Sequence, residues 1–107
     1  MRVTVTGRQR VELPPLLQDM LQAKVEKLEK FSHKILGVHA IFGREKYYYT
    51  AEVTLSTKGM LLVGKAKDER DLLTCMEQAL MKLKEQLRRH ESKLVEKRRR
   101  ALRKLPV

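Results

Sequence analysis

The chain has 107 residues, of which 42% are hydrophobic, and this length and composition predict one domain with one core. With 24 basic and 13 acidic residues the formal net charge is +11, so the first hypothesis is a polyanionic partner. A single cysteine, Cys75, excludes an internal disulfide and favours a reducing compartment. The longest apolar run, Met60 to Val63, is too short for a membrane span or a signal peptide, which predicts a cytoplasmic location without membrane contact.

The first half of the chain predicts a strand, a helix and a second strand. Residues 2–6 alternate between apolar and polar side chains, as is typical of a half-buried strand. Pro14 and Pro15 mark the start of a helix over 16–31, in which apolar residues recur every three or four positions. Gly37 is expected to end this segment, and a short strand over 38–42 and a polar turn over 43–46 follow.

The next two strands are predicted from a second alternating pattern. Residues 47–56 alternate with one apolar and one polar face, and a turn over 57–59 leads into a strand over 60–66. The residues expected to face the core from the first of these strands are Tyr49, Ala51, Val53 and Leu55. A polar segment over 67–71 follows, and Asp71 is expected to be the N-cap of a helix.

The last predicted element is a helix from Asp71 to about Arg103. Apolar residues step by three and four along it, and no Gly or Pro interrupts the pattern before Pro106. Such a helix measures about 50 Å, whereas strands of these lengths reach about 20–25 Å. The helix is therefore expected to extend past its own core.

The element order β-α-β-β-β-α predicts an α+β fold. Hairpin connections favour a four-stranded, mostly antiparallel sheet, and two helices with one apolar face each pack on one side of it. The other face of the sheet is expected to stay open to water. Residues 1–107 are predicted to form a single domain with a basic helical extension over about 95–107.

Most of the excess positive charge lies in the last helix. The stretch from Lys82 to Lys104 holds eleven basic and three acidic residues, a net charge of +8. Steps of about 100° per residue place four of the basic residues in one stripe beside the apolar face. These residues are Lys82, Arg89, Lys93 and Arg100. The stripe favours contact with phosphates, and the alternative is a solvated cationic helix end.

A second cluster of basic residues lies on the first predicted helix. Lysines recur there on one side, at Lys24, Lys27, Lys30 and Lys34, while acidic residues gather on another side. Such separation of charge suits a surface that faces phosphates. The alternative is ordinary i,i+4 pairing, such as Glu26 with Lys30, which stabilises an isolated helix. The two clusters are expected to lie side by side on one face of the molecule.

Few other residues suggest chemistry. The tyrosines at 47–49 could stack on bases, but cross-strand packing is the favoured explanation for them. His90 lies in the apolar register of the last helix and Cys75 is interpreted as a small buried residue. His33 and His39 lack partners at metal-ligand spacing, so no metal is predicted. Because no catalytic motif occurs, the sequence predicts neither enzyme activity, nor a cofactor, nor a small-molecule substrate.

Several short motifs, in order along the chain, resemble the ribosome hibernation promoting factor family, also called ribosome-associated translation inhibitors. Thr6-Gly7-Arg8 ends the first strand as in that family, and Lys27-Leu28-Glu29-Lys30-Phe31 ends the first helix. The other matching motifs are Gly37-Val38-His39, Ala51-Glu52-Val53-Thr54, and Lys82 to His90 in the last helix. Together they cover nearly the whole chain, which is similar to the short form of the family.

This resemblance implies a fold similar in layout to double-stranded RNA-binding domains. It also implies binding to the small ribosomal subunit and its rRNA, in the channel for messenger and transfer RNA, with inhibition of translation during stress or stationary phase. A second hibernation factor is a further partner that the family suggests. The residues that the resemblance and the charge pattern assign to RNA binding are Lys24, Lys27, Lys30, Lys82, Arg88, Arg89 and Lys93.

Two other interpretations use the same charge pattern. The chain could be a general binder of structured RNA that is not specific to ribosomes. The basic helix could also dock on a membrane surface or a partner protein, although few large apolar residues follow Leu94.

Overall fold

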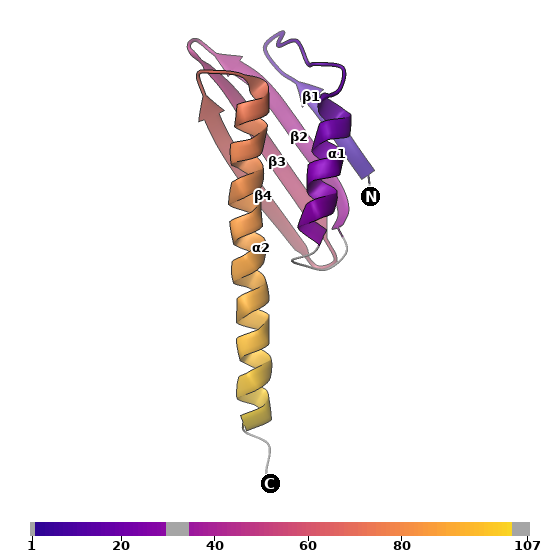
Figure 1. Ribbon diagram of the computed structural model, residues 1–107, viewed down its shortest axis with the longest axis vertical. Coiled ribbons are helices and arrows are strands. Elements are labelled where there is room, and N and C mark those ends of the chain that lie inside the picture. Colours follow the sequence, from indigo (N-terminus) through magenta and orange to yellow (C-terminus); the bar gives the residue numbers. More distant parts are fainter. Residues whose placement is uncertain (1, 30–34, 104–107) are drawn as a thin grey trace.

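The computed structural model describes the backbone of residues 2–29 and 35–103, and the side chains of this set as far as Arg89. The elements follow the predicted order β-α-β-β-β-α (Figure 1). Their bounds are β1 Arg2–Gly7, α1 Leu17–Leu28, β2 Ile35–Glu45, β3 Tyr48–Thr57, β4 Met60–Asp68 and α2 Leu72–Arg103. The predicted α+β class is confirmed.

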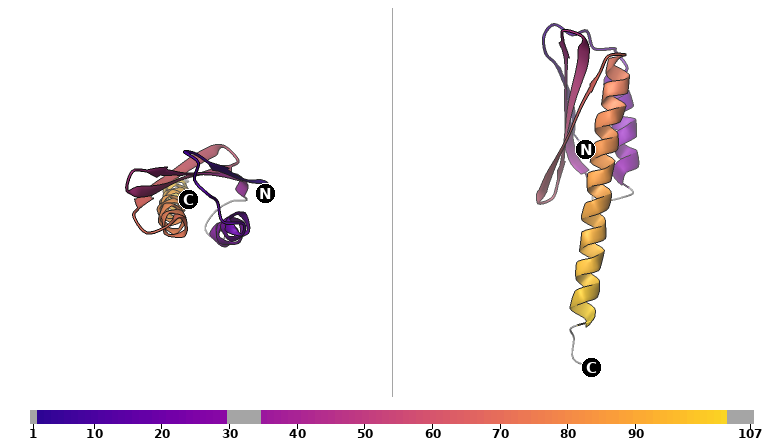
Figure 2. Two further views of the ribbon diagram at one scale, coloured as in Figure 1. Left: turned by 90° about the horizontal axis from the view of Figure 1, so that it is seen from above. Right: turned by 90° about the vertical axis from the view of Figure 1, so that its left-hand side faces the viewer.

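The four strands form one sheet in the order β1-β2-β3-β4. The pairs β2–β3 and β3–β4 are antiparallel, and β1 pairs with β2 in parallel, since α1 carries the chain back across the sheet. Both helices pack on the same face, side by side, and the opposite face carries neither of them (Figures 1 and 2). The expected mostly antiparallel sheet with one open face is therefore confirmed.

The core fills the space between the sheet and the two helices. Alternating residues of β3 face it, as predicted: Ala51, Val53 and Leu55 are buried, and Tyr49 packs against them. Helix α1 contributes residues at three- and four-residue spacing from Leu17 to Leu28, and α2 contributes a longer series that ends at Leu87. The periodicities of 2 and 3.6 in the sequence thus define the two faces that meet.

Gly64 lets α2 approach β4 closely. A Cβ atom at this position would lie 2.4 Å from the Ala79 backbone oxygen and 3.0 Å from Leu83 Cγ. Helix and strand are therefore in direct backbone contact, and this contact fixes the position of α2 on the sheet. At its N-terminus, the Asp71 carboxylate accepts a hydrogen bond of 2.7 Å from the Thr74 N–H, which confirms the predicted N-cap.

Three predicted boundaries are wrong, and each concerns a strand that is longer than expected. Gly37 does not end the segment that follows the first helix, because it lies inside β2, beside Arg2 of β1. The predicted turn over 43–46 is mostly the end of β2, so that Lys46 and Tyr47 alone form the turn to β3. Strand β4 continues through Asp68 because cross-strand pairing with Tyr49 extends past the apolar residues. Part of the predicted helix end, 30–31, lies outside the described residues.

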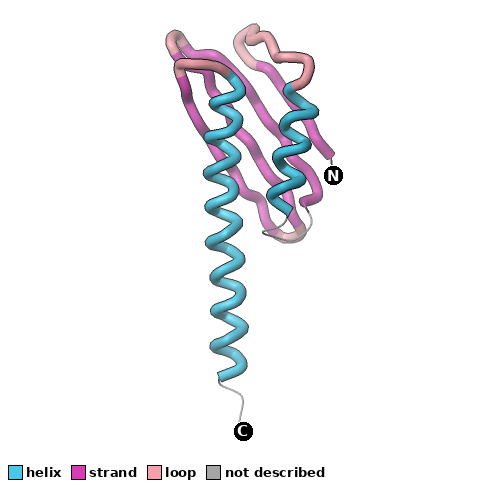
Figure 3. The backbone as a smooth tube through the Cα atoms, in the orientation of Figure 1, coloured by secondary structure: helices cyan, strands magenta, loops and turns pink. Residues whose placement is uncertain are grey.

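Helix α2 extends well past the sheet, as expected from its length (Figures 1 and 3). It has 32 residues, which corresponds to about 48 Å. Its described side chains stop entering the core after Leu87. The last four turns of the helix therefore run beyond the sheet, in the most basic part of the sequence.

Candidate nucleic-acid interface

A shallow groove runs between α1 and α2 on the helical side of the molecule. The residues that line it are Lys24, Lys27, Leu28, Glu77, Leu80, Met81 and Lys84, around a volume of about 340 Å³. Leu28 and Leu80 are buried at its base, whereas Met81 is 70% exposed. The groove therefore combines an apolar base with cationic sides.

Its charge is predominantly positive. Three lysines line it against one acidic residue, Glu77, whose Oε1 lies 3.3 Å from Lys24 Nζ. Lys27 enters from α1 and Lys84 from α2, and Arg88 follows Lys84 by one helical turn on the same flank. Cations from two helices that face a common groove can contact phosphates of a folded nucleic acid.

The opposite flank of α2 faces β4 and makes three hydrogen bonds to it. Gln78, Lys82 and Gln86, spaced four residues apart, form what we call the β4 row. Gln78 Nε2 donates to Asp68 Oδ2 over 2.9 Å, and Gln86 Nε2 donates to the Val63 carbonyl over 2.9 Å. Between them, Lys82 Nζ donates to the Lys65 carbonyl. These bonds attach the helix to the edge of the sheet.

The Asp68 carboxylate, which accepts the bond from Gln78, titrates at an unusually low pH. Arg70 donates to it three times, from its backbone N–H, Nε and Nη2, so that Gln78 is the fourth donor. Mainly because of the Arg70 hydrogen bonds, the pKa of Asp68 is lowered from 3.8 to about 2. The pKa of Asp71 is also lowered, chiefly by the hydrogen bond from the Thr74 N–H.

The residues predicted to bind RNA thus fall into different places. Lys24 and Lys27 meet in the inter-helix groove, and Arg88 is on the flank of α2 that borders it. Lys82 is on the β4 flank, where Arg89 also lies, and Arg89 Nε is 3.3 Å from Glu85 Oε1. The Lys93 position lies in α2, but its side chain, like all of Lys30 and Lys34, is outside the described part of the chain.

The expectation that the two predicted clusters lie next to each other therefore needs correction. The predicted stripe that begins at Lys82 is on α2, but on the flank that faces away from α1. The lysine of α2 that shares a groove with Lys24 and Lys27 is Lys84. Lys84 and Met81 were not among the predicted site residues, because periodicity gives angular positions on a helix but not the identity of its neighbours.

Other candidate residues have structural roles. The Cys75 thiol is buried and donates to the Tyr49 carbonyl over 3.1 Å, and burial raises its pKa. Tyr47 and Tyr48 are exposed near the β2–β3 turn, and Arg44 lies 5.1 Å from the centre of the Tyr49 ring. His39 Nε2 is 3.1 Å from Thr6 Oγ1, and the side chain of His90 is not among those described.

Among the described side chains, in residues 2–29 and 35–89, no group of three or more potential metal ligands comes together. Within residues 2–29 and 35–103, no helix is both long and apolar enough to cross a membrane.

The fold and groove define a small basic α+β domain with a candidate surface for nucleic acid. Residues 3–104 match the family described as Sigma 54 modulation protein / S30EA ribosomal protein. The chain belongs to this family.

Curated relatives carry a consistent name. A protein of Klebsiella oxytoca named ribosome hibernation promoting factor is 31% identical over 94 residues, which cover 88% of this chain and 97% of the relative. Proteins of the same name from Escherichia coli K12 and Azotobacter vinelandii are each 30% identical, over 88% and 91% of this chain. The match covers 97% of the Escherichia coli protein and 89% of the Azotobacter protein.

Solved structures share the fold. The N-terminal domain of Thermus thermophilus Protein Y superposes with a TM-score of 0.73 at 20% identity, over 84% of this chain and 99% of that domain. A ribosomal subunit interface protein from Coxiella burnetii gives a TM-score of 0.76 at 21% identity, over 86% and 99%. At these identities the likeness supports the fold alone.

Proposed function

We propose that the chain is a ribosome hibernation factor that binds rRNA of the small subunit through its helical face. Bound in the channel for messenger and transfer RNA, it inhibits translation by steric exclusion, without catalysis and in the cytoplasm. Membership of the family and the shared name of its relatives support the association with ribosomes. The small subunit, the channel, the stress or stationary-phase setting and a second hibernation factor as partner belong to this proposal.

The observation that carries the proposal is the inter-helix groove. Lys24 and Lys27 from α1 and Lys84 from α2 point toward one shallow trough that is open to solvent. Phosphates of a folded RNA can be contacted from both sides of such a trough, and the exposed Met81 offers an apolar contact for a sugar or a base. Arg88, and then the basic turns of α2 beyond the sheet, continue the positive charge in the same direction.

The residues of the β4 row and their neighbours define a competing version of the same proposal. Lys82, Arg89 and Lys93 carry as many charges as the groove residues, and the family resemblance assigns RNA contacts to them. Lys82 is already bound to a backbone carbonyl and Arg89 is close to Glu85. Because the groove is lined by cations from two helices, whereas the flank with Lys82 and Arg89 belongs to α2 alone, we place the stronger RNA contacts in the groove.

Two matched triple variants test the assignment. Lys27→Gln/Lys84→Gln/Arg88→Gln removes charge from the groove flank, and Lys82→Gln/Arg89→Gln/Lys93→Gln removes the same charge from the other flank. Co-sedimentation with purified small subunits is measured over a series of salt concentrations. The first variant is expected to bind more weakly, with a slope of log K against log salt that is smaller by about two to three.

Three outcomes decide between the versions. If the first variant co-sediments as strongly as the wild-type protein at every salt concentration, the groove assignment is wrong. If only the second variant loses co-sedimentation, the RNA contacts belong to the β4 flank instead. If bulk double-stranded RNA displaces the wild-type protein from the subunits as well as free rRNA does, the chain is a general binder of structured RNA. Thermal melts of both variants confirm that each is folded.

A further inference from the structure

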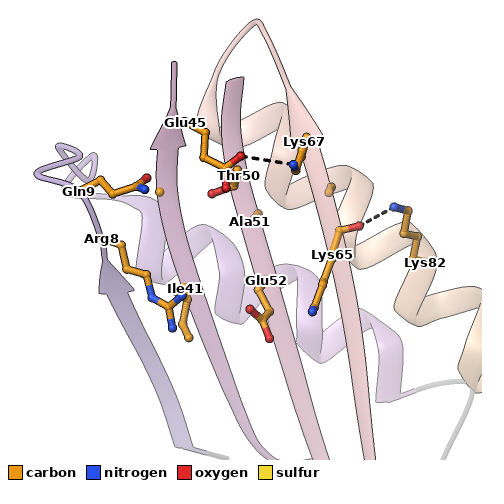
Figure 4. Close-up of a pocket in the computed structure, with 12 residues that line it drawn as sticks. Arg8, Gln9, Ile41, Glu45, Thr50, Ala51, Glu52, Lys65, Lys67 and Lys82 are labelled. Carbon is orange, nitrogen blue, oxygen red and sulfur yellow. Dashed lines mark hydrogen bonds and ion pairs between the residues drawn. The ribbon is translucent and has the colours of Figure 1, made fainter. Parts of the chain in front are cut away.

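The open face of the sheet contains a second hollow, on the side away from the helices (Figure 4). Its volume is about 530 Å³. The lining residues that matter for its chemistry are Arg8, Gln9, Ile41, Thr50, Glu52 and Lys65. These side chains come from β2, β3, β4 and the loop after β1, and those on the strands alternate with the residues that face the core.

Position 43, near the end of β2, is a glycine, and this leaves the hollow open. A Cβ atom on Gly43 would lie 3.0 Å from Thr50 Oγ1 and 3.2 Å from Gln9 Oε1. Any side chain there would fill the space between β1 and β3. Next to it, Ile41 gives the hollow a half-buried apolar floor.

The loop after β1 holds a polar side chain over this space at an energetic cost. Gln9 and Arg10 both have φ of 56°, in the left-handed region that residues other than glycine rarely adopt. In this conformation Gln9 Oε1 accepts a hydrogen bond of 3.0 Å from the Arg44 N–H. The Gln9 amide nitrogen has no partner among the residues that the structure describes. Unfavourable backbone conformations of this kind are commonest at functional sites.

Two cationic side chains on opposite rims of the hollow make no ion pair or hydrogen bond with the described residues. Arg8 and Lys65 are exposed, and neither side chain has an ion-pair or hydrogen-bond partner within the described residues. By contrast, Lys67 Nζ is 3.3 Å from Glu45 Oε2, and Lys82 donates to a carbonyl. The hollow therefore offers two free cationic groups to a ligand.

One carboxylate lies between these cations. Glu52 on β3 is flanked by Ile41 on β2 and Lys65 on β4 (Figure 4). It is half-buried and has no hydrogen-bond partner in the part of the chain described. A ligand made of phosphates alone would be repelled here, whereas a ligand with both phosphates and hydrogen-bond donors would satisfy all three groups.

We propose that this hollow binds a single-stranded segment of RNA that crosses the sheet. Arg8 and Lys65 contact two phosphates of the same strand that are not adjacent, and Glu52 accepts a hydrogen bond from a ribose 2′-hydroxyl or a base amino group. Strands β1 and β4 are three spacings apart, about 14 Å, so the two cations suit a chain of nucleotides better than one nucleotide. Free donors on base edges are available in single strands but are paired in duplexes.

This inference rests on the proposed function and adds a second contact to it. The inter-helix groove and the hollow lie on opposite faces of the sheet, so a bound domain would be held between two RNA segments. Because the aromatic side chains at 47–49 do not line the hollow, stacking contributes little there. Binding in the hollow is therefore expected to depend strongly on salt.

The test uses the full-length protein and a mixed-sequence single-stranded RNA of about 12 nucleotides, with DNA of the same sequence alongside. Arg8→Gln/Lys65→Gln is compared with Arg2→Gln/Lys58→Gln, which removes the same charge outside the hollow. The first variant is expected to lower the salt slope by about 1.4, since each phosphate contact contributes about 0.7. Glu52→Ala is expected to weaken RNA binding, and a loss of the preference for RNA over DNA would identify the 2′-hydroxyl as the group that Glu52 contacts.

The outcomes separate this inference from the proposed function. Equal RNA binding by both double variants, or no binding of single-stranded RNA by the wild type, overturns the hollow as an RNA site. If Arg8→Gln/Lys65→Gln no longer binds ribosomes but still binds single-stranded RNA like the wild type, the hollow contacts a ribosomal protein and the inference is again wrong. Ribosome binding by the groove variant Lys27→Gln/Lys84→Gln/Arg88→Gln tests the proposed function separately. Rescue by Arg8→Lys/Lys65→Arg confirms that charge is what matters.

Discussion

The two flanks of α2 carry similar polar and basic residues, but they have different neighbours. On the flank toward α1, Glu77, Met81 and Lys84 border an open groove. On the flank toward β4, the β4 row donates three hydrogen bonds to the sheet. Two lysines only two positions apart, Lys82 and Lys84, therefore have different surroundings. The comparison teaches that charge counts along a helix do not identify a binding surface until its neighbours are known.

The largest effect is expected from a residue that both flanks need. Leu83 is a fully buried residue on the side of α2 that faces the sheet, and it packs near Gly64. Leu83→Ala is expected to lower the free energy of unfolding by about 2–5 kcal/mol and to weaken both flanks together. Urea unfolding followed by circular dichroism measures this, with Leu83→Met as the volume-conserving control. A loss below about 1 kcal/mol would mean that α2 is not anchored by this contact.

A smaller effect should separate the two lysines. Lys82→Met removes the hydrogen bond to the Lys65 carbonyl and is expected to cost about 0.5–1.5 kcal/mol of stability, with little change in RNA affinity. Lys84→Met is expected to lower RNA affinity more than Lys82→Met does, because Lys84 lines the inter-helix groove. Thermal melts measure the stability of both variants, and RNA titrations measure their affinity. Equal effects of the two variants on both measurements would remove the distinction between the flanks.

A modest gain is expected from the acidic residue of the groove. Glu77 lies 3.3 Å from Lys24, and a phosphate must compete with it. Glu77→Gln is expected to raise RNA affinity up to about fivefold at low salt, because exposed ion pairs contribute about 0–1 kcal/mol. The gain should disappear at high salt. Glu85→Gln, on a position away from the groove, serves as the control, and an identical gain there would indicate a general charge effect.

The smallest effect concerns pH and the β4 flank. The pKa of Asp68 is about 2 in the folded protein and 3.8 ordinarily, so its ionised form stabilises the fold. This contribution is complete above about pH 4 and is lost as the pH falls toward 2. Urea unfolding at several pH values should therefore show a decline over this interval that is shallower in Asp68→Asn. Parallel pH profiles of the two proteins would show that Asp68 is not the group responsible.

The strands and helices could be predicted because their periodicities are strong. Alternation in β3 placed Ala51, Val53 and Leu55 inside, and the three- and four-residue spacing gave both helices. Asp71 was identified as a cap from its residue type and position. Strand ends were less predictable, since Lys67 and Asp68 are held in β4 by pairing with β3 rather than by their own preferences.

The candidate site was predictable only in part. Helical spacing correctly separated the Lys82 side of α2 from its apolar face, but it could not say which flank meets α1. That depends on the strand order, which places α2 over β3 and β4, next to α1. The hollow over Gly43 was not predicted, because it combines residues from three strands and a loop that are distant in sequence.

The hydrogen bonds at the edges of the sheet have a consequence for self-association. Lys82 and Gln86 occupy carbonyl groups on the free side of β4, and on β1 Gln18 Nε2 donates to the Val3 carbonyl over 3.3 Å. An incoming polypeptide would find these acceptors taken and helix side chains in its way. These contacts oppose edge-to-edge pairing of sheets from different molecules. A protein with two such edges can therefore remain dispersed at high concentration.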